Sequence, residues 1–359
     1  MSNTATRVES AGGAVHNEPV RGTTAAARLA RLGFLGVGWI GLSRLRAVVQ
    51  SGAAEIACIA DAAPESVTRA AQAALMPMQP PPRTVASLEE LLEEELDGLV
   101  IATPSGQHAQ QAIAALTRGL AVFCQKPLAT SAAEATRVVG VARALDRLLD
   151  VDFCYRTVAG VPELARLVRS GDLGEVFAVD MAFHNAYGPD KSWFYDRGQS
   201  GGGCVMDLGI HLVDLLLWAL GFPEVVEVRS HLYAEGKPLA IRETALEDYA
   251  AAELRLASGT VARLACSWRL PAGRDAVIEA AFYGTRGAAI LRNVNGSFYE
   301  FTVEHCEGTR RRLVAGPPDD WGGRAVCAWA QRLAENAAFD SGAERLVAVA
   351  HVVDRIYGQ

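Results

Sequence analysis

The stretch LGFLGVGWIGLSRLRAVVQSG, residues 32–52, decides how the chain begins to fold. Its opening run, LGFLGV, is typical of a buried strand, and SRLRAVVQS has the apolar spacing of an amphipathic helix. Gly52 then supplies a helix stop. Because Gly36, Gly38 and Gly41 lie between the two, the segment predicts the strand, glycine-rich turn and helix that open an α/β unit.

The glycine-rich turn also predicts a binding site for a dinucleotide. Missing side chains let backbone amides at the start of the helix approach a pyrophosphate. The residues predicted to do so are Gly36, Gly38, Trp39, Ile40 and Gly41. A turn that only packs the helix on the strand is the alternative.

Asp61 strengthens the dinucleotide prediction. It ends the next predicted strand, EIACIAD, 25 residues after Gly36, where a carboxylate can accept both hydroxyls of an adenosine ribose. Its charge would repel a 2′-phosphate, and residues 62–64 supply no arginine to hold one, so NAD is favoured over NADP. Two alternatives stay open: Arg69 could turn back toward the phosphate of NADP, and Asp61 could be a plain helix cap.

Strand and helix patterns alternate up to about residue 152, which indicates a parallel sheet wound on both faces. Beyond that point strand-like runs follow one another between Gly, Pro and Ser turns, which indicates a mostly antiparallel sheet. The predicted class is therefore α/β with two domains. The predicted divisions are a flexible tail over 1–28, a Rossmann dinucleotide-binding domain over 29–152, and a C-terminal α/β domain with a large, mostly antiparallel open sheet over 153–359.

Composition and charge exclude several kinds of partner. The 34 basic and 41 acidic residues give a net charge of −7, and no basic run interleaved with aromatics occurs, so nucleic acid is not expected. No apolar stretch reaches about 18 uncharged residues, so no membrane span is expected. The seven cysteines lie far apart and without metal-ligand spacing, which predicts no metal site and reduced thiols in a cytoplasm.

Two predicted strand ends carry further candidates for cofactor binding, because ligands of open α/β sheets bind at the carboxyl ends of the strands. The candidates are Thr103, Pro104, Ser105 and His108 after the fourth strand, and Gln125 and Lys126 after the fifth. Lys126 directly follows the buried-type strand AVFCQ, and a buried unpaired charge is costly. A functional role is therefore predicted for Lys126, with a structural ion pair as the alternative.

A second group of polar residues lies in GGGCVMDLGIHLVD, residues 201–214, within an otherwise apolar and therefore buried helix. Asp207, His211 and Asp214 stand at spacings of four and three, which predicts one polar stripe along a single helix face. A histidine beside carboxylates is suited to moving a proton near neutral pH. The alternative is that Asp207 caps the helix while His211 and Asp214 hydrogen-bond each other in the core.

These motifs, in this order, resemble the glucose-fructose oxidoreductase, inositol dehydrogenase and rhizopine-catabolism family of NAD(P)-dependent oxidoreductases over roughly residues 31–359. The resemblance implies that the open sheet belongs to a substrate domain that commonly makes oligomer contacts, so a homo-oligomer, a dimer or tetramer, is expected. It implies that Lys126, Asp207 and His211 are the catalytic residues and that the Lys126–Pro127 peptide is cis, a trans proline being the alternative. The chain departs from the family pattern at Ser105 and Gln125, where asparagine and glutamate are usual.

The function expected from this resemblance is hydride transfer between NAD and a hydroxyl-bearing carbon of a sugar, cyclitol or related polyol. His211 would take the hydroxyl proton, Asp207 would orient the imidazole or bind a neighbouring hydroxyl, and Lys126 would stabilise the oxyanion. Candidates for substrate binding are Tyr155, Arg156, His184, Asn185, Trp193 and Trp268. An NAD-dependent glycosidase of the same fold and a dinucleotide- and sugar-sensing regulator without activity are the alternatives.

Overall fold

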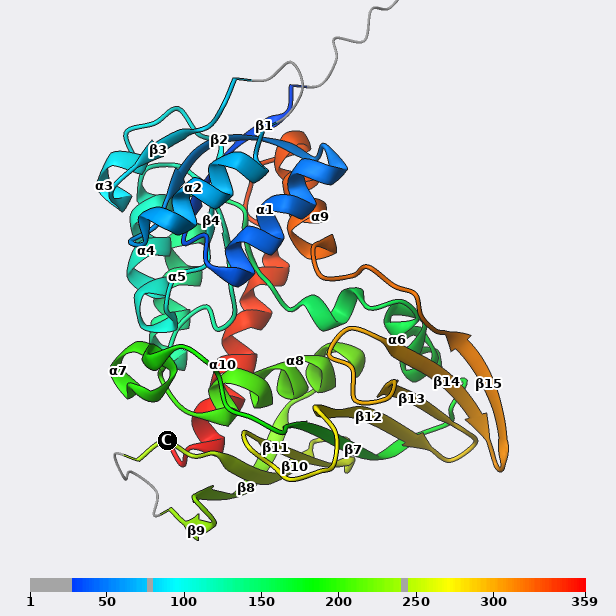
Figure 1. Ribbon diagram of the computed structural model, residues 1–359. Helices are drawn as coiled ribbons and strands as arrows, with labels where there is room; N and C mark the ends of the chain where they lie inside the picture. Colours follow the sequence, from blue (N-terminus) through cyan, green and yellow to red (C-terminus); the bar gives the residue numbers. More distant parts are fainter. Residues whose placement is uncertain (1–27, 76–79, 240–244) are drawn as a thin grey trace, which may run out of the picture.

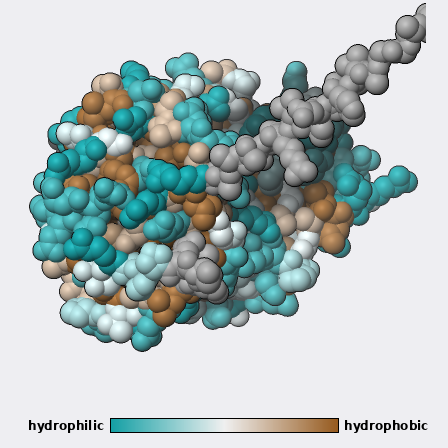
Figure 2. All heavy atoms as spheres, turned by 90° about the horizontal axis from the view of Figure 1, so that it is seen from above, coloured by the Kyte–Doolittle hydropathy of each residue, from teal (hydrophilic) through white to brown (hydrophobic). Residues whose placement is uncertain are grey.

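A computed structural model of the chain describes residues 28–75, 80–239 and 245–359 (Figure 1). The expected flexible tail, apart from Arg28, lies outside the described residues. The described part contains a six-stranded sheet and a nine-stranded sheet, with helices between and around them. From above, over the first sheet and its helices, hydrophilic and apolar side chains are interspersed on the surface (Figure 2).

The first sheet is fully parallel and has the strand order β3-β2-β1-β4-β5-β6. Its strands are β1 (Ala30–Leu35), β2 (Ala54–Ala60), β3 (Arg83–Val85), β4 (Gly98–Ile101), β5 (Ala121–Cys124) and β6 (Leu149–Val151). This is the order of a doubly wound dinucleotide-binding fold, and it confirms the predicted Rossmann sheet. The order reverses between β1 and β4, and ligands of such sheets bind in the crevice outside the carboxyl ends of the strands at this point.

Helices cover both faces of the first sheet, which explains why its strands are continuously apolar. The helices that follow β1 to β5 are α1 (Trp39–Ser51), α2 (Pro64–Ala73), α3 (Leu88–Leu91), α4 (Ser105–Thr117) and α5 (Ala132–Ala144). One core lies under α1 and α2, and the other under α4 and α5. Side chains of β4 alternate between them: Val100 belongs to the first core, and Leu99 and Ile101 belong to the second.

Helix α9 (Arg324–Glu335) follows the second sheet in the chain but packs on the first. Its fully buried Trp329 lies against Phe123 of β5, with ring centroids 5.6 Å apart. The sequence of α9 does not say which of the two sheets the helix covers. The domain boundary near residue 153 stays a prediction.

The second sheet has the order β15-β14-β13-β12-β7-β11-β10-β8-β9. Its strands are β7 (Val176–Asn185), β8 (Val225–Ala234), β9 (Lys237–Pro238), β10 (Tyr249–Leu256), β11 (Val261–Ser267), β12 (Ala276–Gly284), β13 (Ala288–Asn293), β14 (Phe301–Glu307) and β15 (Arg310–Ala315). Among these described strands only β7 and β11 pair in parallel, so the expected mostly antiparallel sheet is confirmed. Among the described elements, α6 (Val161–Ser170), α8 (Ile210–Ala219) and α10 (Glu344–Ile356) cover one face of it (Figure 1).

The helical stretch Arg197–Ala219 lies in the middle of the molecule. It combines α7 (Arg197–Ser200), a π-helical turn η3 (Val205–Gly209) and α8. By length and composition it could cross a membrane, but 89% of its most apolar window is buried inside the protein. A buried core helix passes the same test, and this stretch has the surroundings of one.

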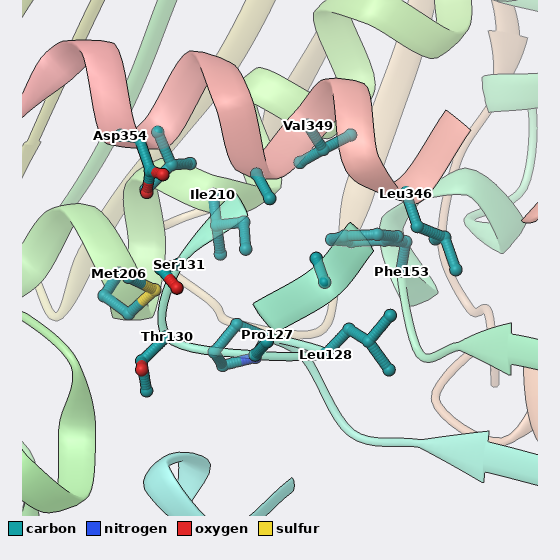
Figure 3. Close-up of a pocket in the computed structure, with 14 residues that line it drawn as sticks. Pro127, Leu128, Thr130, Ser131, Phe153, Met206, Ile210, Leu346, Val349 and Asp354 are labelled. Atoms are coloured by element: carbon teal, nitrogen blue, oxygen red, sulfur yellow. The ribbon is translucent and has the colours of Figure 1, made fainter. Parts of the chain in front are cut away.

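Helix α10 also supports the loop that follows Lys126 (Figure 3). The Lys126–Pro127 peptide is cis, as the resemblance implies. Pro127 and Leu128 line a small apolar cavity together with Ile210 and with Val349 of α10. Just beyond, the amide of Ala132 donates to the carboxylate of Asp354 on α10 over 2.9 Å. The strand end that carries Lys126 is therefore held against helices of the second sheet.

Candidate active site

The glycine turn has the geometry that a bound dinucleotide needs. Gly36 has a φ of +82°, and a Cβ on Gly36 would lie 2.6 Å from the backbone of Ala102. A Cβ on Gly41 would lie 2.0 Å from the carbonyl oxygen of Gly36, so both positions exclude any side chain. A Cβ on Gly38, by contrast, would have no neighbouring atom of the described chain within 4 Å. In this part of the described chain no side chain caps α1, so its first N–H groups are available to an anion, and the turn fits a pyrophosphate.

Asp61 lies at the end of β2 beside the glycine turn. Its Oδ2 accepts a hydrogen bond from the amide of Val37 over 2.6 Å, and its Oδ1 accepts one from Ala63 over 2.8 Å. Each oxygen keeps a further lone pair. The first turn of α2 has no side-chain cap, so Asp61 is not the cap of that helix. The carboxylate is thus fixed at the strand end with acceptor capacity to spare.

His108 joins two loops at the strand ends. Its Nε2 lies 2.8 Å from the carbonyl oxygen of Thr103, and its Nδ1 lies 2.6 Å from that of Pro127. Burial lowers the pKa of the ring, while the two carbonyls act in the opposite direction. Because both nitrogens face protein carbonyls, His108 supports the loops instead of offering a nitrogen to a cofactor. Pro104 and Ser105 lie at the start of α4, beside the same crevice.

Lys126 reaches across to the helix stretch of the second sheet. Its Nζ donates to Oδ1 of Asp207 over 2.8 Å and to the carbonyl oxygen of Asp207 over 2.6 Å. Oδ2 of Asp207 accepts from Nε1 of Trp268 over 3.0 Å. The lysine and aspartate side chains are 17% and 16% exposed, so the pair is largely but not fully buried. Two of the three ammonium protons are used, and one remains for a ligand.

His211 lies beside this pair as a buried ring, 9% exposed. It packs edge-on against Tyr155, with ring centroids 4.9 Å apart. Burial first, and then the positive charges of Lys126 and Arg44, hold the pKa of the imidazole well below its usual value. Its Nδ1 is buried without a hydrogen-bond partner among the described residues. His211 is therefore neutral at pH 7 and able to accept a proton.

In the described part of the chain, the residues of the expected polar stripe, Asp207, His211 and Asp214, do not hydrogen-bond one another. Asp207 pairs with Lys126, and Asp214 accepts from both Nε and Nη2 of Arg156, the first over 2.9 Å. Neither carboxylate bonds to His211, so Asp207 does not orient the imidazole, and the alternative of a His211–Asp214 bond is wrong too. The physical reason is that each of the two carboxylates is paired with a cation from another part of the fold, Lys126 for Asp207 and Arg156 for Asp214.

The six residues expected to bind substrate divide into two groups. Tyr155 and Trp268 join the cluster through His211 and Asp207. Arg156 does not, because Asp214 holds its guanidinium and the ring of Trp218 lies 5.8 Å from it.

The other three candidates lie near the end of β7 and the segment after it. Nδ1 of His184 lies 2.8 Å from the hydroxyl of Ser267, and burial lowers the pKa of the ring. Oδ1 of Asn185 is buried without a partner among the described residues. Trp193, in the 3₁₀ turn η2 (Ser192–Tyr195), stacks on Phe194 at 3.8 Å. These side chains do not contact the Lys126–Asp207 pair through any hydrogen bond in the described part of the chain.

Two charged residues next to the cluster were not predicted. Nε of Arg44, from α1, donates to Oδ2 of Asp152 over 2.5 Å, and Nε2 of Gln125 donates to the same oxygen over 2.5 Å. The signal that singled out Lys126, a charge directly after a buried strand, applies equally to Asp152 after β6. Arg44 carries no comparable signal, since arginine is common on amphipathic helices.

Comparison with known protein families finds a match for each of the two parts of the chain. The family model "Oxidoreductase family, NAD-binding Rossmann fold" matches residues 30–153, and the model "GFO/IDH/MocA C-terminal domain" matches residues 161–290. The two ranges together cover most of the described chain.

Individual relatives extend this similarity. Rhizopine catabolism protein MocA from Rhizobium meliloti is 30% identical over 192 residues, which are 53% of this chain and 57% of that protein. D-glucoside 3-dehydrogenase from Escherichia coli (strain K12) is 27% identical over 214 residues, 56% of this chain and 60% of that protein. The matches thus span less than two thirds of either relative. Among solved structures, levoglucosan dehydrogenase in complex with NADH superposes with a TM-score of 0.76 at 20% identity, covering 92% of this chain and 96% of that one.

Proposed function

The chain belongs to the GFO/IDH/MocA family of oxidoreductases, and from that membership we propose that it transfers a hydride between a nicotinamide cofactor and a hydroxyl-bearing carbon of a sugar, cyclitol or related polyol. The observation that carries the proposal is the contact of Lys126 with Asp207 beside a neutral His211. It brings a cation from a strand end of the dinucleotide-binding sheet together with a carboxylate and a base from the second sheet's helices.

The roles of these groups follow from their chemistry. The cofactor, when bound, supplies the hydride acceptor. His211 takes the proton of the substrate hydroxyl, and because Nδ1 is buried, Nε2 is the nitrogen that can do so. The remaining N–H of Lys126 stabilises charge on the substrate oxygen. Asp207 holds Lys126 in place and lies where it can accept from a neighbouring hydroxyl.

The residues that would hold the cofactor line the crevice of the first sheet. The glycine turn and the start of α1 offer N–H groups to the pyrophosphate, Asp61 offers acceptors to the adenosine ribose, and Gln125 and Lys126 lie at the other half of the sheet. The charge of Asp61 supports NAD rather than NADP. Thr103, Pro104 and Ser105 follow β4, next to the point where the strand order reverses.

Changing Asp61 to alanine is expected to raise the dissociation constant of NAD about 10-fold and to reduce the preference in affinity for NAD over NADP. The change removes both the acceptor for the ribose hydroxyls and the charge that repels a 2′-phosphate. Asp61→Asn, which keeps the shape and removes the charge, should narrow the preference with less loss of affinity. Titration of both nucleotides against the three proteins measures this. A parent protein that already prefers NADP would contradict the assignment.

The reaction class is tested with a panel of free sugars, cyclitols and aryl glycosides in the presence of NAD. Net formation of NADH with a free polyol supports the dehydrogenase. Release of the aglycone without net NADH would indicate the glycosidase instead, and binding of nucleotide and sugar without either product would indicate the sensor. The three results exclude one another, so one experiment separates the alternatives.

We also propose a homo-oligomer, a dimer or tetramer, in a reducing cytoplasm. The support for this proposal is the family resemblance, in which the open sheet commonly makes oligomer contacts. The described cysteines are free thiols, including Cys204 and Cys266, whose sulfurs lie 3.8 Å apart. Light scattering on the eluting protein and thiol titration after lysis under argon test the two proposals.

A further inference from the structure

A buried group of charges at the carboxyl ends of β5 and β6 has no part in the mechanism above. Asp152 is fully buried, and its Oδ2 accepts from Arg44 and from Gln125, each over 2.5 Å. Arg44 is 5% exposed. Oδ1 of Asp152 is buried and has no hydrogen-bond partner among the described residues. One oxygen of the Asp152 carboxylate thus accepts two hydrogen bonds, while the other accepts none from the described residues.

Stability alone is a poor explanation for this arrangement. Removing two charges from water costs several kcal/mol per ion, and a well-packed apolar pair is often at least as stable. A buried pair with an orphaned oxygen loses part of what would offset that cost. A functional role therefore explains the burial of these charges better than stability does.

The strand order places these charges in one half of the crevice. Asp61 at the end of β2 marks the adenosine half, so the ends of β4, β5 and β6 form the nicotinamide half. Gln125 connects Asp152 to the catalytic lysine, because its Oε1 accepts from the backbone amide of Lys126 over 3.2 Å. Arg44 is also near His211, since its charge contributes to the low pKa of that ring.

The charges of this half balance. Arg44 and Lys126 are two cations, and Asp152 and Asp207 are their two carboxylate partners. The nicotinamide ring is positively charged when oxidised and neutral when reduced. Removing one carboxylate would leave an uncompensated cation that repels the oxidised ring and has little effect on the reduced one.

We propose that Asp152 is a positioning residue that balances the charge of Arg44, holds the amide of Gln125, and thereby favours the oxidised form of the nicotinamide cofactor. The proposal rests on the proposed function. It concerns the affinity for the oxidised cofactor relative to that for the reduced cofactor. A merely structural role of Asp152 would not change this ratio, because loss of structure weakens the binding of both forms alike.

The test measures dissociation constants of NAD and NADH for the purified full chain, by titration calorimetry. Asp152→Asn should raise the ratio of the NAD constant to the NADH constant about 10-fold. Arg44→Gln should change the ratio in the opposite direction, because it leaves the carboxylate uncompensated. The double variant should return the ratio to within about twofold of the parent, because both charges are then absent.

Asp150→Asn is the matched control, because Asp150 lies two residues away, on β6, and pairs with Arg332 instead of Arg44, over 3.2 Å. It should leave the ratio unchanged. If Asp152→Asn fails to show a cooperative melting transition, Arg44→Gln and the double variant still decide the question.

The outcomes separate the two proposals. A parent protein that binds neither nucleotide overturns the proposed function. A parent that binds both, with a ratio unchanged in Asp152→Asn and in Arg44→Gln, overturns only the role of Asp152. A double variant that keeps the altered ratio of either single variant overturns the charge-balance argument as well.

Discussion

Replacing His211 with alanine is expected to lower kcat by about 100-fold or more, the usual contribution of a general base, while the dissociation constant of NADH stays within about twofold. The imidazole is buried against Tyr155 and neutral, so its loss removes the proton acceptor without removing a cofactor contact. Steady-state kinetics on the substrate identified by the panel, together with nucleotide titration, measure both quantities. His231→Ala, at an exposed position of β8, is the control and should behave as the parent.

The pH dependence provides a second measurement of the same role. A general base works in its deprotonated form, so activity falls as the pH falls through its pKa. Burial and the charges of Lys126 and Arg44 lower the pKa of His211 from its ordinary value of 6.5. The acid limb of the pH profile, where activity falls with falling pH, should therefore lie below pH 6.5. Turnover that is unchanged in His211→Ala, or an acid limb above neutrality that persists in that variant, would remove His211 from the mechanism.

Replacing Lys126 with methionine is expected to lower kcat by about 100-fold to 1,000-fold, since it removes the donor that stabilises charge on the substrate oxygen. The same change leaves Asp207 as a largely buried carboxylate without its cation, which costs about 3–5 kcal/mol of stability. Thermal melting measures the stability loss, and kinetics below the melting temperature measure the loss of turnover.

The double variant Lys126→Met with Asp207→Asn separates the two effects. Removing both charges should recover most of the lost stability, because no unpaired charge remains. Turnover should stay low, because the donor is still missing. Recovery of turnover together with stability would mean that Lys126 is only a structural ion-pair partner, the alternative that the sequence leaves open.

Local patterns in the sequence determine the fold class and most of the candidate site. The strand, glycine turn and helix over residues 32–52 depend on near neighbours: Gly36 is required by its φ of +82°, and Gly41 by the carbonyl oxygen of Gly36 within the same turn. Asp61 and Lys126 are found because each follows a buried strand, and the ends of parallel strands share one edge of the sheet. These inferences need only spacing and the alternation of strands and helices.

Tertiary structure alone decided which partner each charged group has. Asp152 meets Arg44 across 108 residues of chain, and Lys126 meets Asp207 across 81 residues. Asp207 and Asp214 pair with different cations, Lys126 and Arg156, although their spacing along an ideal helix puts them on one face with His211. Spacing describes only neighbours within one element, whereas desolvated charges are paired by whichever opposite charge the packing of distant elements brings within hydrogen-bond reach.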